Sequence, residues 1–294
     1  MKKIIIGSRG SDLALWQANF VKDELEKLGQ EVEIKVISTQ GDRIQHLSFD
    51  KMEGKGFFTK EIEAALLDKS IDLAVHSHKD LETTSPEGLV IAAVSYREDP
   101  SELLLIRNEA VDDDKVFGIK ENPIIGTSSA RRKSQLITFR GDFEIKDLRG
   151  NVGTRVNKLR EGQYDAIVLA MAGIKRLDLD LSDLTISTLD PTLFIPCPAQ
   201  GVLGLQIREE DTDLAKVLKE MNDVEVEKRI GIERGVLRNM EGGCQLPLGI
   251  YCDEEETVHV AFARKWEDGA KFSTFSAVDN EGIVEEILEH INNQ

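Results

Sequence analysis

The sequence predicts an α/β protein with two similar α/β halves followed by a small α+β unit. Three observations support this prediction. Strand-like apolar runs alternate with helix-like periodic segments up to residue 94, the same alternation restarts at residue 103, and a different pattern begins at residue 224. Repeated alternation of strands and helices is typical of helices layered on a largely parallel sheet.

In the first half, apolar residues spaced three and four apart predict helices, and compact or alternating apolar runs predict strands. Thr59 stands where the second helix would begin and is a candidate N-cap. The expected strands are residues 3–7, 31–38, 71–75 and 89–94, and the expected helices are residues 11–28 and 59–69.

The second half repeats the pattern, with strands expected at 103–106, 123–126 and 166–169 and helices at 129–138 and 151–161. Residues 191–201 contain three prolines and are expected to form a hinge or crossover. In the last part we expect helices at 224–240 and 281–291 and strands at 249–253, 257–266 and 272–278. The predicted domains are residues 1–98 with 200–222, residues 99–199, and residues 223–294.

Composition indicates a folded protein of a reducing compartment. Hydrophobic residues make up 40% of the 294 residues and charged residues 31%. No apolar run approaches the roughly 20 residues of a membrane span, and the N-terminal apolar stretch is too short for a signal peptide. Three cysteines cannot all pair, and none lies in a CxxC motif. We therefore expect a cytoplasmic protein with free thiols and no membrane association.

Charge is distributed unevenly along the chain. The formal net charge of −17 argues against a nucleic-acid binder. From residue 126 to residue 176, however, eleven basic residues face five acidic ones, a surplus of six. Solvated helix faces would be the plain explanation. The more specific explanation is a site for small acidic ligands, because focused positive charge attracts them.

Three junctions between a strand and a helix in this basic region could bind anions. Backbone N–H groups and the helix dipole favour anions at such places, and arginine suits carboxylates because its planar fork donates two parallel hydrogen bonds. Phosphate would suit the same groups, so the residues alone leave both ligands open. The candidate residues are Thr127, Ser128, Ser129, Arg131, Arg132, Arg149, Arg155 and Arg176.

The first half offers matching loops around Arg9 and Ser11, around Lys51, Lys55 and Phe58, and at residues 76–80. For the two histidines of the last loop, hydrogen bonding at a strand end is favoured over metal ligation, because no third ligand has a telling spacing. Asp80 beside Lys79 could be a plain surface ion pair. In a cleft it would stay ionised and could stabilise a cation.

Cys244 follows two glycines at a predicted helix end, where glycine permits left-handed backbone and close approach of a ligand. From its spacing alone, a buried structural cysteine is the more common outcome. Cys197 and Cys252 lie in apolar or strand context and are expected to be packing residues.

Taken together, six stretches resemble the porphobilinogen deaminase (hydroxymethylbilane synthase) family. They occur in the family's order and span most of the chain. They are Ser8-Arg-Gly-Ser-Asp-Leu-Ala-Leu-Trp-Gln, Gly54-Lys-Gly-Phe-Phe-Thr-Lys-Glu, His76-Ser-His-Lys-Asp, Gly126-Thr-Ser-Ser-Ala-Arg-Arg, Leu148-Arg-Gly-Asn-Val-Gly-Thr-Arg and Glu241-Gly-Gly-Cys-Gln-Leu-Pro.

The resemblance implies a fold and an activity. The fold is two domains similar to type II periplasmic binding proteins plus a third that carries the cysteine, in a monomer. The activity is head-to-tail condensation of four porphobilinogen molecules on a dipyrromethane cofactor, joined to Cys244 by a thioether. Ammonia leaves at each step, water releases hydroxymethylbilane, and uroporphyrinogen-III synthase receives it.

The resemblance also implies residue roles. Asp80 would be catalytic, contacting pyrrole nitrogens, assisting ammonia loss and stabilising the azafulvenium cation. Lys51 and Lys55 belong to a loop that would cover the cleft. Carboxylates of cofactor and substrate would be held chiefly by basic and hydroxyl residues. The cofactor set is Cys244, Lys79, Asp80, Thr127, Ser128, Ser129, Arg131 and Arg132, and the substrate set is Arg9, Ser11, Phe58, Arg149, Arg155 and Arg176.

Two departures from the family pattern concern local conformation. Leu81-Glu82-Thr83 lacks a proline common after the catalytic motif, and residues 195–202 carry proline and cysteine where the family has Pro-Ala-x-Gly-Gln-Gly. A passive anion-binding protein with the same fold remains an alternative, since fold alone does not determine function. Such a protein would need neither Cys244 nor Asp80. A phosphate-dependent transferase would be expected to have a Walker-type loop, which the sequence lacks.

Overall fold

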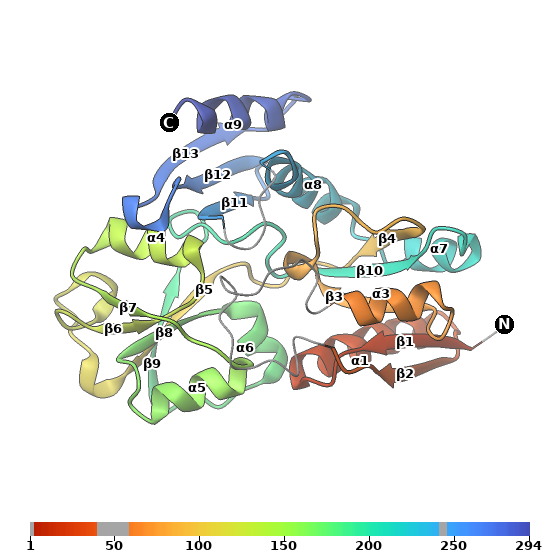
Figure 1. Cartoon of the computed structure of the whole chain (residues 1–294), viewed down its shortest axis with the longest axis horizontal. Helices are drawn as coiled ribbons and strands as arrows, with labels where there is room; N and C mark the ends of the chain where they lie inside the picture. Colours follow the sequence, from red (N-terminus) through yellow and green to blue (C-terminus); the bar gives the residue numbers. More distant parts are fainter. Residues whose placement is uncertain (1–2, 40–58, 241–245) are drawn as a thin grey trace. The chain divides into compact units, whose positions relative to one another are not determined.

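The computed structural model describes residues 3–39, 59–240 and 246–294 (Figure 1). The chain divides into two compact units. Unit 1 is Met1–Glu98 with Gly201–Lys228, and unit 2 is Asp99–Gln200 with Arg229–Gln294. The boundary at residue 228 falls inside helix α8 (Val224–Asn239). The division into three domains stays a prediction.

Unit 1 is built on a five-stranded sheet with the order β2-β1-β3-β10-β4. All its neighbouring strands are parallel except β10, which runs antiparallel to both β3 and β4. The strands are β1 (Ile4–Ser8), β2 (Val32–Val36), β3 (Leu73–Ser77), β4 (Leu89–Val94) and β10 (Leu203–Arg208). The helices are α1 (Asp12–Lys27), α3 (Lys60–Leu67), the 3-10 helix η2 (His78–Asp80) and α7 (Thr212–Lys219).

Helices cover both faces of this sheet, because successive strand side chains point to opposite faces. Leu73 and Val75 pack with residues of α1 and α7. Ala74, between them, packs with residues of α3. Strands buried on both faces explain why the predicted runs at 71–75 and 89–94 are almost continuously apolar.

Unit 2 contains a second five-stranded sheet with the order β7-β6-β8-β5-β9. Here β5 is the strand that runs antiparallel to both neighbours, and the other pairs are parallel. The strands are β5 (Glu102–Arg107), β6 (Ile124–Gly126), β7 (Glu144–Lys146), β8 (Ala166–Ala170) and β9 (Leu184–Leu189). The helices are α4 (Ala130–Phe139), α5 (Val152–Arg160), α6 (Met171–Leu177) and the 3-10 helices η3 (Asn108–Ala110) and η4 (Val116–Gly118).

The two sheets share one topology. Each sheet has three neighbouring parallel strands, β1, β2 and β3 in unit 1 and β6, β7 and β8 in unit 2. In both sheets the second of these strands lies at the edge, followed by the first and then the third. The antiparallel strand, β10 or β5, occupies the fourth place. Helix α4 covers one face of the second sheet, and α5 and α6 cover the other. The prediction of two similar α/β halves is confirmed.

The last part of the chain is an antiparallel three-stranded sheet, β11 (Leu248–Cys252), β12 (Thr257–Phe262) and β13 (Lys271–Ser276). Residues of α8 and of α9 (Ile283–Asn292) pack with it, and η5 (Trp266–Asp268) connects two of its strands. Within unit 2 this sheet meets α4, where the Ala270 N–H donates to Thr138 Oγ1 over 2.7 Å (Figure 1). The predicted small α+β unit is confirmed.

Residues 190–202 connect β9 of unit 2 to β10 of unit 1, so the proline-rich segment is a crossover. Gln135 holds both polar groups of the Ile195 peptide, accepting from its N–H over 2.7 Å and donating to its carbonyl oxygen over 2.8 Å. Gly201 has φ +88°, and a Cβ there would lie 2.1 Å from the Glu98 carbonyl oxygen. Only glycine fits that position. In the described part of the chain, no helix combines the length and apolar character needed to span a membrane.

Candidate active site

In unit 1 the predicted site residues follow two neighbouring parallel strands. Arg9 and Ser11 come directly after β1, and Lys79 and Asp80 lie in η2 directly after β3. The carboxyl ends of parallel strands meet at one edge of a sheet, which is where ligands bind in such folds. Asp80 is exposed and Lys79 is half-buried. The hydroxyl of Ser11 accepts from the Ala14 N–H over 3.4 Å and so caps α1.

Beneath this edge lies a chain of polar side chains that the sequence did not predict as connected. His76 Nε2 lies 3.0 Å from Gln206 Oε1, and Gln206 Nε2 donates to Glu63 Oε1 over 3.3 Å. Burial lowers the pKa of His76 to about 4, and the nearby Arg9 charge acts in the same direction. Burial also raises the pKa of Glu63. His76 is therefore neutral at physiological pH and braces β3 against β10 just before the Asp80 turn.

In unit 2 the predicted residues again gather at the carboxyl edge of parallel strands. The three hydroxyl residues between β6 and α4 have local structural contacts. Thr127 Oγ1 accepts from the Ser129 N–H over 3.3 Å, and Ser129 Oγ caps α4 by accepting from the Arg132 N–H over 3.4 Å. Ser128 Oγ donates to the Leu148 carbonyl and accepts from its N–H, both over 3.0 Å. These contacts bind the β6–α4 loop to the loop after β7.

Arg131 and Arg132 are buried, with 5% and 7% of their surface exposed. Both form ion pairs with the fully buried carboxylate of Glu102, the first residue of β5. Arg131 also donates to the Ile195 carbonyl and Arg132 to the Val168 carbonyl, each over 2.9 Å. The dipole at the start of α4 does not favour these cations, so the buried carboxylate supplies a compensation that the sequence did not reveal.

Three further arginines belong to the segments that follow the parallel strands of this sheet. Arg149 and Arg155 follow β7, and Arg176 is buried in α6 after β8. Arg155 Nε donates to the Gly150 carbonyl over 2.7 Å, which folds its side chain back over the turn that begins α5. Gly150 has φ +113°, and Asn151 caps the helix by accepting from the Thr154 N–H over 2.8 Å. The turn thus fixes the backbone positions of Arg149 and Arg155.

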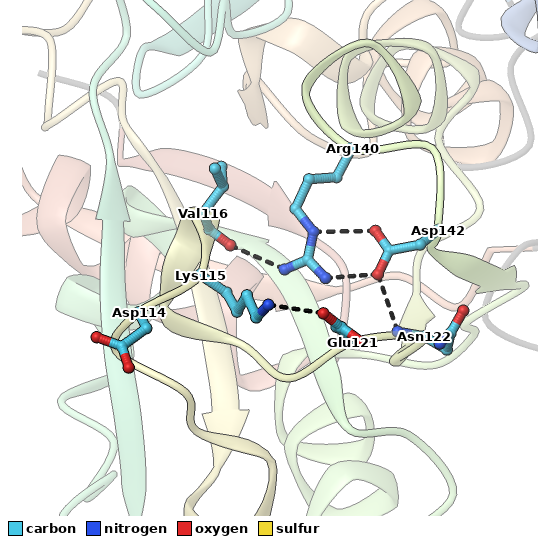
Figure 2. Close-up of a pocket in the computed structure, with 7 residues that line it drawn as sticks. All are labelled: Asp114, Lys115, Val116, Glu121, Asn122, Arg140 and Asp142. Atoms are coloured by element: carbon cyan, nitrogen blue, oxygen red, sulfur yellow. Dashed lines mark hydrogen bonds and ion pairs between the residues drawn. The ribbon is translucent and has the colours of Figure 1, made fainter.

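The pocket in Figure 2 lies elsewhere, with a volume of about 430 Å³. Its lining residues precede β6 and β7, at the amino edge of the parallel strands, and none is a predicted site residue. Within it, Arg140 donates to Asp142 through Nε over 2.9 Å and through Nη2 over 2.6 Å. Hydrogen bonds that Asp142 accepts from Arg140 and from the Asn122 N–H hold the pKa of its carboxyl at about 2. This pocket is walled by internal ion pairs.

The sequence model of a family described as porphobilinogen deaminase, dipyromethane cofactor binding domain, matches residues 4–216. The chain belongs to the porphobilinogen deaminase family. A porphobilinogen deaminase of Oceanobacillus iheyensis is 44% identical over 265 residues, covering 89% of this chain and 84% of the relative. One of Bacillus cereus is 46% identical over 253 residues, covering 85% and 80%.

Among solved structures, a periplasmic binding protein of Salmonella typhimurium with high arginine specificity overlaps 78% of this chain and 93% of its own. The identity is 11% and the TM-score 0.43. The fold is defined by the strand order of its sheets. For a porphobilinogen deaminase, a cofactor-binding domain that spans both α/β sheets agrees with basic loops at the edge of each.

Four predicted site residues of this family member, Cys244, Lys51, Lys55 and Phe58, lie outside the described residues. Sequence reasoning also missed Glu102. The available signal was a carboxylate placed directly before the apolar run of β5, where a buried charge needs a partner.

Proposed function

We propose that the chain condenses four porphobilinogen molecules head to tail on a dipyrromethane attached to Cys244 and releases hydroxymethylbilane by hydrolysis. In each condensation the C–N bond of the incoming aminomethyl group breaks and ammonia leaves. A C–C bond forms to the free α-carbon of the preceding pyrrole, which loses its proton. When bound, the dipyrromethane supplies the first such carbon.

The observation that supports this proposal is the group of arginines in the loops and helices that follow the parallel strands of the second sheet. Each pyrrole carries an acetate and a propionate, so the cofactor and the growing chain are rich in carboxylates. Arginine binds carboxylates through paired N–H donors. Three of the arginines, Arg131, Arg132 and Arg176, are buried, where charge-assisted hydrogen bonds gain strength. The residues present therefore fit a carboxylate-rich cofactor.

This placement supports individual roles for the residues. Ser129, with Thr127 and Ser128, shapes the start of α4, and Arg131 and Arg132 receive carboxylates of the cofactor there. Arg149, Arg155 and Arg176 hold carboxylates of the substrate, as do Arg9 and Ser11 at the edge of the first sheet. All these residues bind the cofactor or the substrate, and none of them moves a proton.

Asp80 is the catalytic residue of the proposal. It lies on a short 3-10 turn held at its base by the His78 N–H, which donates to the Val202 carbonyl over 2.9 Å. Its two oxygens accept hydrogen bonds from pyrrole N–H groups and stabilise the cation left when ammonia departs from the substrate. Lys79 beside it binds a cofactor carboxylate. A fixed carboxylate aimed at developing positive charge is commonly a large catalytic contribution.

The cellular setting is part of the same proposal. The protein works in the cytoplasm, where its cysteines stay reduced. The hydroxymethyl group of its linear product is reactive, so the next enzyme must cyclise that product promptly. We place uroporphyrinogen-III synthase in that role.

The test is the mass of the intact protein. Protein incubated with porphobilinogen is expected to gain an adduct of two linked pyrroles, and Cys244→Ser is expected to gain none. Cys197→Ser is the matched control, because Cys197 is a half-buried thiol in unit 2 outside the proposed site, and it should keep the adduct. Active protein with an unmodified mass would contradict the proposal.

A further inference from the structure

Glu102 occupies a particular place in the second sheet. It is the first residue of β5, paired in register with Ala170 of β8 and Leu189 of β9, and it is fully buried. Because β5 runs antiparallel to β8, its amino end lies at the edge where the parallel strands have their carboxyl ends. A buried carboxylate therefore lies at the edge that carries the arginines.

The carboxylate of Glu102 holds two guanidinium groups. Arg132 grips it from the side, with Nε donating to Oε1 over 3.0 Å and Nη2 donating to Oε2 over 2.7 Å. Arg131 donates through Nη2 to Oε1. Consecutive residues on a helix point about 100° apart, so the shared carboxylate draws together two forks that would otherwise diverge.

Arg131 and Arg132 differ from an arginine whose donors all have acceptors within the protein. A guanidinium has five N–H donors. Arg140 makes five hydrogen bonds, two to Asp142 and three to backbone carbonyls, some of them drawn in Figure 2. With acceptors in the described part of the chain, Arg131 makes two and Arg132 makes three. Donors therefore remain on two side chains from which water is almost excluded.

The charges of these groups also indicate that the pair can bind an anion. Among these three buried groups, two guanidinium groups and one carboxylate leave one positive charge, and an unbalanced buried charge is costly. We propose that Glu102 is a positioning residue, which aligns Arg131 and Arg132 and reduces their joint charge so that the pair receives one carboxylate of the cofactor. This inference rests on the proposed function. Without Glu102, the two cations would repel each other and their forks would turn to other acceptors.

The experiment compares cofactor loading in two variants at this position. Glu102→Gln keeps the shape and removes the charge, and it is expected to slow the appearance of the dipyrromethane adduct about tenfold or more, because misplaced binding groups lose rate steeply. Glu102→Asp keeps the charge but withdraws the carboxylate by one methylene, so it is expected to load faster than Glu102→Gln and more slowly than the unaltered protein. Asp142→Asn, which removes the partner of Arg140 far from this edge, should load normally.

Folding is checked by circular dichroism, and the reactivity of Cys244 with a thiol reagent shows whether the attachment point is intact. Loading at the unaltered rate by folded Glu102→Gln would overturn the inference. Equal slowing in Glu102→Asp would overturn the part of the inference that concerns charge, because that variant keeps the charge. If the unaltered protein gains no adduct, the proposed function fails, whereas loading by both proteins refutes only the role of Glu102.

A second measurement avoids the variant, should Glu102→Gln not fold. In the Cys244→Ser protein, which carries no cofactor, the Nε–H of Arg132 is expected to exchange slowly with water in ¹⁵N-arginine NMR spectra. The Nε–H of Arg140, bonded to Asp142 over 2.9 Å, gives the reference for a fixed guanidinium. Fast exchange at Arg132 beside slow exchange at Arg140 would show that Glu102 does not position the fork before the cofactor arrives.

Discussion

Replacing His76 by glutamine should remove a defined part of the protein's sensitivity to acid. His76 is 7% exposed and its Nε2 lies 3.0 Å from Gln206 Oε1. Burial lowers its pKa to about 4 in the folded protein, against about 6.5 in an unfolded chain. Glutamine can still pair with Gln206 and does not titrate.

The sign follows from which state binds the proton. Well above pH 6.5 the ring is neutral in both states and has no effect. As the pH falls below that value the unfolded chain takes up a proton first, so the folded state loses stability until the pH reaches the folded pKa. With these two pKa values, the loss between about pH 7.5 and about pH 5.5 is about 1.3 kcal/mol.

Unfolding by urea, followed through tryptophan fluorescence, would measure this loss. The sequence has two tryptophans, so a Trp266→Phe background leaves Trp16 of unit 1 as the reporter. The free energy of unfolding of the His76 protein should fall by about 1.3 kcal/mol more than that of His76→Gln over this range. The remaining titrating groups are shared, so they cancel. Parallel curves for the two proteins would refute the assignment of His76 as a buried neutral residue.

Two other predictions concern catalysis and folding. Asp80→Asn should retain substrate binding, with KM little changed. Its kcat in steady-state assays should fall roughly a thousandfold, because the charge that stabilises the cation is gone. A near-normal kcat would contradict the catalytic role of Asp80. Gly201→Ala should lower the free energy of unfolding by roughly 2–5 kcal/mol, because the methyl group would meet the Glu98 carbonyl at 2.1 Å and φ is +88°. Gly29→Ala, with φ +77° and open space around it, should cost roughly 1 kcal/mol, and an equal loss in both would show that the carbonyl contact is unimportant.

Local periodicity predicted the elements whose signal lies within one segment. The runs at 71–75 and 89–94 are β3 and β4 within two residues, and the spacing from residue 11 onward became α1. The small α+β unit was predicted for the same reason. In β12 the buried Val258 and Val260 alternate with the less buried Thr257 and His259, which leaves a readable alternation.

Elements that depend on distant partners were not predicted. Strand β10 follows the crossover directly, and it is defined by its pairing with β3 and β4, far earlier in the chain. The pairing of Glu102 with Arg131 and Arg132 spans about thirty residues and joins a strand to a helix across the sheet edge. Hydroxyl residues such as Ser128 were predicted to face anions, whereas their observed bonds hold loops, because caps satisfy backbone groups locally.

The position of β10 in the chain has a consequence for synthesis on the ribosome. Every strand of the second sheet lies between residues 102 and 189, so that sheet can close as soon as β9 emerges. In the described part of the chain, β4 pairs only with β10, which ends at residue 208. A chain made from its N-terminus therefore completes the second sheet before the first. Until then β3 has an open edge and β4 has no strand partner among the described residues. This nascent stage is therefore the one most exposed to wrong strand pairing.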